Sequence, residues 1–139
     1  MSNIIDKYTL SSKKVPYGDF KPNLNVHPGS RDVQVLSETD TIKSCIINIL
    51  KTKPYERPFQ PTLGSMISSL LFENITEQTL LFAQQIIKDA VATHEPRARV
   101  ETVTVSPTEQ DNGIYITIVF YILNSNNPIT IDLVLNKVR

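Results

Sequence analysis

Residues 114–123 read IYITIVFYIL, and this stretch decides the fold. Every second residue from Ile114 onward is apolar, and the residues between them, from Tyr115 onward, are a mixture of apolar and polar. Such a pattern is typical of a central strand that packs on helices. An Asp-Asn-Gly turn signal at 111–113 precedes the stretch, and residues 98–105, rich in valine and threonine, precede the turn. We therefore predict a β-hairpin here.

The same period of two returns after a second turn, at residues 124–128. Residues 129–136 alternate between apolar and polar side chains, which predicts a last strand with one buried face. Helical periods occur only before these strands. This order indicates an α+β fold, in which about three helices pack on a C-terminal antiparallel three-stranded β-meander.

Two of the helices have clear start signals. Ser37 is predicted to cap a helix that ends before Pro54. Thr76 is predicted to cap a longer helix that stops near His94, because Pro96 disfavours helical dihedral angles in the residue before it. The apolar residues expected on the buried stripes of these two helices are Ile42, Cys45, Ile46, Ile49, Leu50, Leu80, Ala83, Ile87, Ala90 and Val91.

The segment between these helices, residues 53–62, contains three prolines and is expected to be irregular. Thr62 is predicted to cap a short helix after it, with the apolar residues Leu63, Met66, Ile67, Leu70 and Leu71. Cys45, which lies on the apolar stripe of the first helix, is interpreted as a small core residue and not as a nucleophile.

The first part of the chain shows neither the helical spacing of apolar residues nor the alternation that is typical of a strand. Residues 1–31 contain several prolines and glycines and are predicted to form an extended N-terminal arm. This arm is either a solvated tail or a segment that orders against a partner. Residues 32–36 alternate weakly and predict a short strand. Because 139 residues suit one compact domain, residues 32–139 are assigned to a single α+β domain.

The composition excludes several classes of protein. Fourteen basic residues balance fourteen acidic ones, which argues against nucleic acid as a partner. One cysteine and two histidines supply neither a disulfide framework nor a Cys/His metal site, so we expect no metal and no other cofactor. There is no apolar run of membrane-spanning length and no signal peptide, which predicts a soluble protein made inside the cell, without a membrane partner.

No specific catalytic motif is present. The glycine-rich nucleotide motifs, the G-x-S-x-G nucleophile elbow and the H-E-x-x-H zinc motif are missing from the sequence. A glycoside hydrolase needs two carboxyl groups on either side of the sugar bond, and Glu56, Glu73 and Glu95 near element boundaries keep this alternative open. The sequence thus favours a protein without catalytic residues, with a peptidoglycan hydrolase as the alternative.

Two short patterns differ from generic packing. Residues 52–59 combine Glu56 and Arg57 with two prolines, and the Glu-Pro-Arg sequence at 95–97 places opposite charges on both sides of a rigid proline elbow. One interpretation is that these charges tie the loop to the elbow through ion pairs. The other is that they are offered to a partner, since a planar guanidinium makes bidentate contacts at little ordering cost.

These patterns resemble the small baseplate wedge proteins of contractile-tailed phages. This is the gene-product-twenty-five-like, or "lysozyme-like", wedge family, and it includes the wedge component of type VI secretion baseplates. The resemblance covers roughly residues 19–135. The family pattern T-x-P-G-E-R-x-x-x-P-x-x-G is similar to residues 52–64, with Tyr55 in place of the usual glycine. The family's E-P-R elbow corresponds to Glu95, Pro96 and Arg97.

The resemblance implies a structural component of a contractile-tail baseplate wedge, located in the virion tail baseplate and assembled in the host cytoplasm. It also implies that the chain lies next to the tail tube and binds the helical core bundle of the larger wedge subunits through Glu95, Pro96 and Arg97. We add Glu56 and Arg57 to this partner-binding set. The implied partners are the larger wedge subunits, the tail sheath protein and other wedge or hub proteins near the tube. A small cytosolic binding module unrelated to phages remains a third class of function.

The family's sheet resembles the strand-exchanging part of the sheath protein, which implies that the chain initiates sheath polymerisation by β-strand exchange. A three-stranded meander has an edge with unpaired N–H and C=O groups. The last strand lacks the lysines and prolines that usually protect such an edge. The predicted sheath-facing residues are therefore Thr130, Ile131, Asp132, Leu133 and Val134. The alternative is that the arm of residues 1–31 covers this edge.

Overall fold

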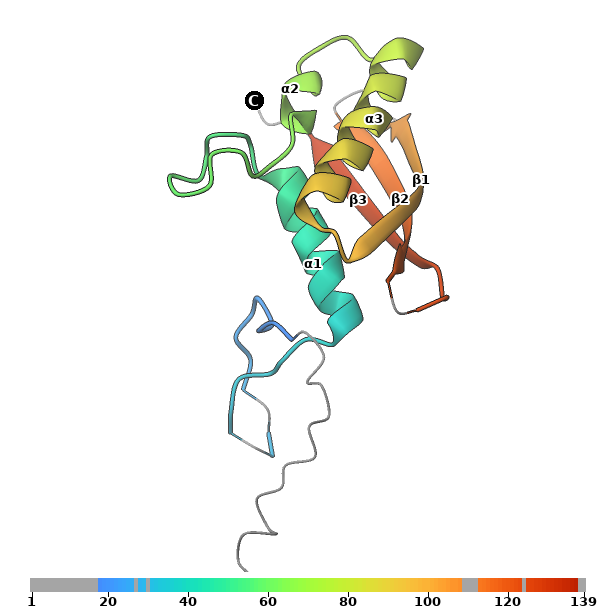
Figure 1. Ribbon diagram of the computed structural model, residues 1–139. Helices are drawn as coiled ribbons and strands as arrows, with labels where there is room; N and C mark the ends of the chain where they lie inside the picture. Colours follow the sequence, from blue (N-terminus) through green and yellow to red (C-terminus); the bar gives the residue numbers. More distant parts are fainter. Residues whose placement is uncertain (1–17, 27, 30, 109–112, 124, 138–139) are drawn as a thin grey trace, which may run out of the picture. The chain divides into compact units, whose positions relative to one another are not determined.

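The computed structural model describes residues 18–26, 28–29, 31–108, 113–123 and 125–137. The chain divides into two compact units, residues 1–41 and residues 42–139. Three helices are followed along the chain by three strands, as Figure 1 shows.

The helices are α1 (Glu38–Lys51), α2 (Ile67–Leu70) and α3 (Glu77–His94). The strands are β1 (Ala98–Pro107), β2 (Gly113–Ile122) and β3 (Ile129–Asn136), and they form one antiparallel sheet in the order β1-β2-β3. The prediction of about three helices followed by a three-stranded antiparallel meander is therefore confirmed.

The central strand β2 has the two faces that its alternation predicts. Its buried side chains are Ile114, Ile116, Ile118, Phe120 and Ile122. Tyr115, on the other face, is 39% exposed. Ile118 pairs with Val103 of β1 and with Ile131 of β3, and all three side chains are buried. One face of the sheet thus belongs to the core, and α3 lies across that face (Figure 1).

The helices complete this core through the predicted stripes. Buried residues of α1 and α3 that pack in the core are Ile42, Ile46, Leu50, Ala83, Ile87 and Val91. Cys45 is only partly buried, so its interpretation as a core residue is wrong. Its position on α1 places it at the margin of the stripe, because Ile42, Ile46 and Leu50 occupy the centre.

Both predicted capping residues at the start of the long helices are confirmed. The Ser37 hydroxyl accepts a hydrogen bond from the Asp40 N–H at 3.2 Å, and α1 starts at the next residue after Ser37. The Thr76 hydroxyl accepts one from the Thr79 N–H at 3.2 Å. Helix α3 ends at His94, as the following Glu-Pro sequence predicts.

The short helix differs from its prediction, since Thr62 does not cap it. Helix α2 is a single turn that begins at Ile67, and the residue before it, Met66, makes no side-chain capping bond. The chain first turns back to the end of α1: the Ser65 N–H donates to Thr52 O at 3.0 Å, and the Ser65 hydroxyl donates to Leu50 O at 3.0 Å. These bonds delay the helix beyond the position that Thr62 could cap.

Gly64 makes this return possible. Its φ of +131° is a conformation that other residues rarely adopt, and a Cβ atom there would lie 2.6 Å from Thr52 O. Gly64→Ala is therefore expected to lower the free energy of unfolding by about 1–3 kcal/mol, the usual effect of backbone strain of this kind. Urea denaturation compared with Ser68→Ala, a change on the neighbouring helix, measures the effect. Equal stability of the two variants would contradict the expected strain.

The first unit contains backbone bridges in place of the predicted strand. Residues 32–36 do not form a strand, and two isolated antiparallel bridges join Phe20 to Val35 and Val26 to Val33. The Gln34 N–H donates to Asn25 O at 3.0 Å. The predicted strand is wrong because its partner, residues 20–26, pairs with it only at separated positions. Residues 1–17 lie outside the described residues, and the boundary of the arm at residue 31 remains a prediction.

Candidate functional site

The Glu-Pro-Arg elbow joins the last turn of α3 to the first residue of β1. The Glu95 N–H donates to Val91 O at 2.8 Å, which extends the helical bonding by one residue. Pro96 then ends the helix, and the Ala98 N–H donates to Glu95 O at 3.1 Å. The result is a tight turn in which residues 95 and 97 lie close enough for their side chains to meet.

Their side chains form a bidentate ion pair. Arg97 Nε lies 2.6 Å from Glu95 Oε1, and Arg97 Nη2 lies 2.6 Å from Glu95 Oε2. The Glu95 side chain is only 4% exposed, whereas that of Arg97 is 28% exposed. The sequence does not reveal this difference in burial, because both residues flank a proline at the surface end of a helix.

The elbow also reaches α1 through Cys45. Arg97 Nη2 lies 4.0 Å from the Cys45 Sγ, at the limit of a weak hydrogen bond to sulfur. The partly buried cysteine therefore lies beside the ion pair, although the sequence predicted it in the core. This contact brings together residues far apart in the sequence, one on α1 and one in the elbow.

The ion pair with Arg97 lowers the pKa of Glu95. The hydrogen bond from Arg97 is the main cause that holds the pKa of Glu95 below its ordinary value of 4.5. Burial opposes this shift, and the positive charge of Arg97 and a hydrogen bond from Cys45 reinforce it. Glu95 is thus a carboxylate at neutral pH, and protonating it requires a pH below the ordinary range.

A pH dependence of stability follows from this lowered pKa. Because the folded protein binds the proton of Glu95 less readily than the unfolded chain, the pair stabilises the fold above pH 4.5 and stops doing so as pH falls through the lowered pKa. We expect the stability difference between the native chain and Glu95→Gln to shrink in this acid range. Unfolding free energies of both proteins between pH 7 and acid pH test it, and a difference independent of pH would contradict it.

Glu56 and Arg57 lie in the loop between α1 and α2, and the loop holds the acid in place. The Glu56 carboxylate accepts a hydrogen bond from the Lys53 N–H at 2.9 Å. Glu95 and Arg97 bind each other. The Glu56 bond lies within the loop and the Glu95–Arg97 pair lies within the elbow, so the interpretation in which these charges tie the loop to the elbow remains a prediction. Both Glu56 and Arg57 are exposed.

The predicted edge strand lies apart from the elbow in the sheet. The elbow leads into β1, and β2 separates β1 from β3. Thr130, Asp132 and Val134 of β3 are exposed, and the alternate residues Ile131 and Leu133 are buried. The Asp132 carboxylate accepts a hydrogen bond from the hydroxyl of a β2 threonine, Thr117, at 2.8 Å.

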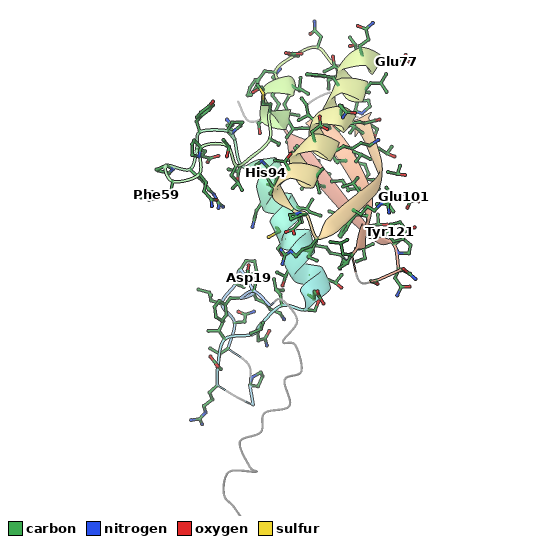
Figure 2. The ribbon with its side chains drawn as sticks, viewed as in Figure 1. Asp19, Phe59, Glu77, His94, Glu101 and Tyr121 are labelled. Carbon is green, nitrogen blue, oxygen red and sulfur yellow. The ribbon has the colours of Figure 1, made fainter. Side chains whose placement is uncertain are left out.

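Two further surface features were missed in the sequence. A groove of about 400 Å³ runs between α2 and α3 and is lined mostly by apolar residues, among them Met66, Leu70, Phe82 and Ile86. The signal was the apolar Phe82 and Ile86 beside the buried stripe of α3. At the β1 bulge, Glu101 accepts a hydrogen bond from Tyr121 and raises the pKa of that hydroxyl; Figure 2 shows the two residues side by side.

Clusters of metal-ligating side chains and helices able to span a membrane are both absent from the described part of the chain. Within residues 18–26, 28–29, 31–108, 113–123 and 125–137, no three His, Cys, Asp or Glu side chains gather where they could hold a metal ion. None of the helices in these ranges has the length and apolar character to cross a membrane. His94 lies at the end of α3, and His27 is outside the described residues.

Comparison with known proteins gives the family. The family model for baseplate wedge protein gp25 matches residues 36–127 of the chain. The baseplate wedge protein gp25 of Enterobacteria phage T4 is 30% identical over 113 residues, which cover 81% of this chain and 85% of the T4 protein. Both matches confirm the resemblance found in the sequence, and they argue against a binding module unrelated to phages.

Solved structures agree with this fold. A protein of Geobacter sulfurreducens with the provisional name tail lysozyme is 27% identical, with a TM-score of 0.69 over 75% of this chain and 95% of that protein. A chain of the anti-feeding prophage baseplate is 20% identical, with a TM-score of 0.54 over 88% of this chain and 82% of that chain, which shows the fold alone. The family match and the T4 relative carry the assignment: this chain belongs to the gp25 family of baseplate wedge proteins and is a structural component of a contractile-tail baseplate.

Proposed function

We propose that this chain binds the helical core bundle of the larger wedge subunits, next to the tail tube, and initiates sheath polymerisation by β-strand exchange. The wedge contact is made by Glu95, Pro96 and Arg97, together with Glu56 and Arg57 of the loop. The sheath contact is made by the edge of β3 from residue 130 to residue 134. The sheath protein and the other wedge or hub proteins near the tube complete the set of partners.

The single observation that carries the wedge contact is the geometry of Arg97. Both oxygens of a buried carboxylate hold its guanidinium, yet the side chain is still 28% exposed. A cation fixed in this way meets a partner with little further loss of conformational entropy. The same arrangement also serves the internal stability of the elbow, so the two roles must be separated by experiment.

The sheath contact is supported by the edge position of β3. The strand is last in the sheet order, and its residues 129–136 include no lysine and no proline. An unprotected edge of this kind invites pairing with another strand. Coverage of the edge by residues 1–31 remains the alternative, and those residues are mostly outside the described ranges.

Co-expression with the larger wedge subunits of the same tail tests the wedge contact. We expect a complex that survives size-exclusion chromatography and contains this chain together with the core-bundle subunits. A matched control is Leu81→Ala, at an exposed site on α3, which should leave the complex intact. Elution of the native chain free from all wedge subunits would contradict the proposal.

We propose further that the chain is not a peptidoglycan hydrolase. A glycosidase acid needs a raised pKa, and the pKa of Glu95 is lowered by its ion pair with Arg97. The purified protein should therefore fail to clear a suspension of cell walls. Clearing that is lost in Glu56→Gln, Glu73→Gln or Glu95→Gln, with the variant still folded by circular dichroism, would establish the hydrolase instead.

A further inference from the structure

The proline-rich loop of residues 53–62 carries two aromatic side chains with almost no contact to the rest of the chain. Phe59 is 97% exposed and Tyr55 is 83% exposed. Figure 2 shows Phe59 at the far end of the loop, which projects from between α1 and α2. Single exposed apolar residues are common on protein surfaces, but two nearly bare aromatic rings on one short loop mark an interaction site.

The loop is braced by its own backbone. The Tyr55 N–H donates to Pro61 O at 2.8 Å, which closes the loop across its base. The Gln60 N–H donates to Arg57 O at 3.2 Å near its tip, and the Glu56 side chain binds the Lys53 N–H. Three prolines fix further φ angles. Such a loop holds the backbone of its two aromatic residues in one arrangement, so binding requires little additional ordering of the main chain.

Tyr55 is held in a strained conformation. Its φ is +66°, in the left-handed region that glycine enters freely and that a residue with a Cβ atom enters at a cost. The exposed ring recovers little of this cost through packing within the chain. Residues held in sparsely populated conformations cluster at binding sites, where the strain serves the contact with a ligand or partner.

The charges beside the rings indicate the kind of partner. Lys53 and Arg57 are both exposed, and the carboxylate of Glu56, the acid between them, already binds a backbone N–H of the loop. The loop therefore offers aromatic rings together with positive charge. Tyrosine and arginine dominate the centres of protein interfaces, where aromatic rings fill apolar pockets and arginine pairs with carboxylates.

We propose that the rings of Tyr55 and Phe59 insert into an apolar pocket, edged by carboxylates, on one of the larger wedge subunits. Arg57 pairs with the carboxylates at the rim of that pocket. This inference rests on the proposed function, because it takes a wedge subunit as the partner, and it names a contact made by residues other than the elbow.

Two substitutions test it through opposite effects on stability and binding. Tyr55→Gly removes the ring and relieves the backbone strain, so the thermal unfolding midpoint of this variant should rise. Its Kd for the co-purified wedge subunits should increase about tenfold, because the ring is lost. Phe59→Ala should weaken the Kd by a similar factor without moving the midpoint, because the ring has almost no contacts to lose. If Tyr55 only supported the fold, Tyr55→Gly would lower the unfolding midpoint and leave the Kd unchanged.

Leu81→Ala is the matched control, because Leu81 is an exposed apolar residue (64%) on α3, and it should change neither quantity. Arg57→Glu should weaken binding more than Arg57→Ala, since it places like charges at the rim. If the native chain binds no wedge subunit, the proposed function fails. If the native chain binds and both Tyr55→Gly and Phe59→Ala bind equally well, only the insertion of the aromatic loop is overturned.

Discussion

Arg97→Ala is expected to lower the free energy of unfolding by about 2–4 kcal/mol, because it leaves the Glu95 carboxylate buried without the guanidinium that binds both of its oxygens. The partial exposure of Arg97 keeps the effect below that of a fully buried pair. Chemical denaturation at neutral pH measures the loss. At acid pH, where Glu95 is protonated in both proteins, the difference should become smaller.

A double variant separates the stability of the elbow from its proposed binding role. Replacing both partners of a buried pair by apolar residues of similar size is often nearly neutral for stability, so Glu95→Met combined with Arg97→Leu should recover most of the loss. This variant should be folded although it lacks the arginine. If it fails to join the wedge complex, the elbow binds a partner. If it assembles like the native chain, the ion pair serves only the fold and the elbow proposal is wrong.

The second large effect is expected at the edge of β3. A proline placed at one of the residues among 130–134 whose N–H faces away from β2 removes one outward donor and should block addition of another strand. The expected phenotype is a baseplate that contains this chain and supports a tail tube but carries no extended sheath. Electron microscopy of tails assembled in a host that expresses only the variant measures it.

The control for this experiment is a proline at a neighbouring residue whose N–H faces β2. That substitution breaks a bond of the sheet, so it should reduce stability as well as sheath assembly. The outward proline, confirmed as folded by circular dichroism and present in the baseplate, should affect sheath alone. Sheath of normal length on such baseplates would show that β3 does not receive the first sheath strand.

Local sequence patterns predicted correctly those features of the fold that depend on residues close together in the chain. The alternation from Ile114 predicted the faces of β2, and Ser37 and Thr76 predicted two helix starts, because a cap binds an N–H only a few residues away. Thr62 does not cap α2, because hydrogen bonds between residues more distant in the sequence turn the chain before the helix begins. The N–H and the hydroxyl of Ser65 bind Thr52 O and Leu50 O at the end of α1.

The burial of Glu95 and Arg97 in the candidate site could not be predicted from any local sequence pattern. The Glu-Pro-Arg sequence predicted an elbow with opposite charges, but not that Glu95 is buried while Arg97 is partly exposed. Cys45 of α1, which is far away in the sequence, lies beside this pair. The strand predicted at residues 32–36 failed in the same way, since a strand needs a partner and the residues opposite it pair only at isolated positions.

The bulge in β1 makes the two edges of the sheet unequal. The register between β1 and β2 shifts between Val100 and Thr102, whereas β2 and β3 pair without interruption from Gly113↔Asn136 to Phe120↔Ile129. A bulged edge resists further pairing and a regular one accepts it. The sheet therefore has one regular edge, β3, among the described strands. Under the proposed strand exchange, each copy of this chain would start one sheath strand through β3, and two copies joined through β3 would leave only bulged strands at their outer edges.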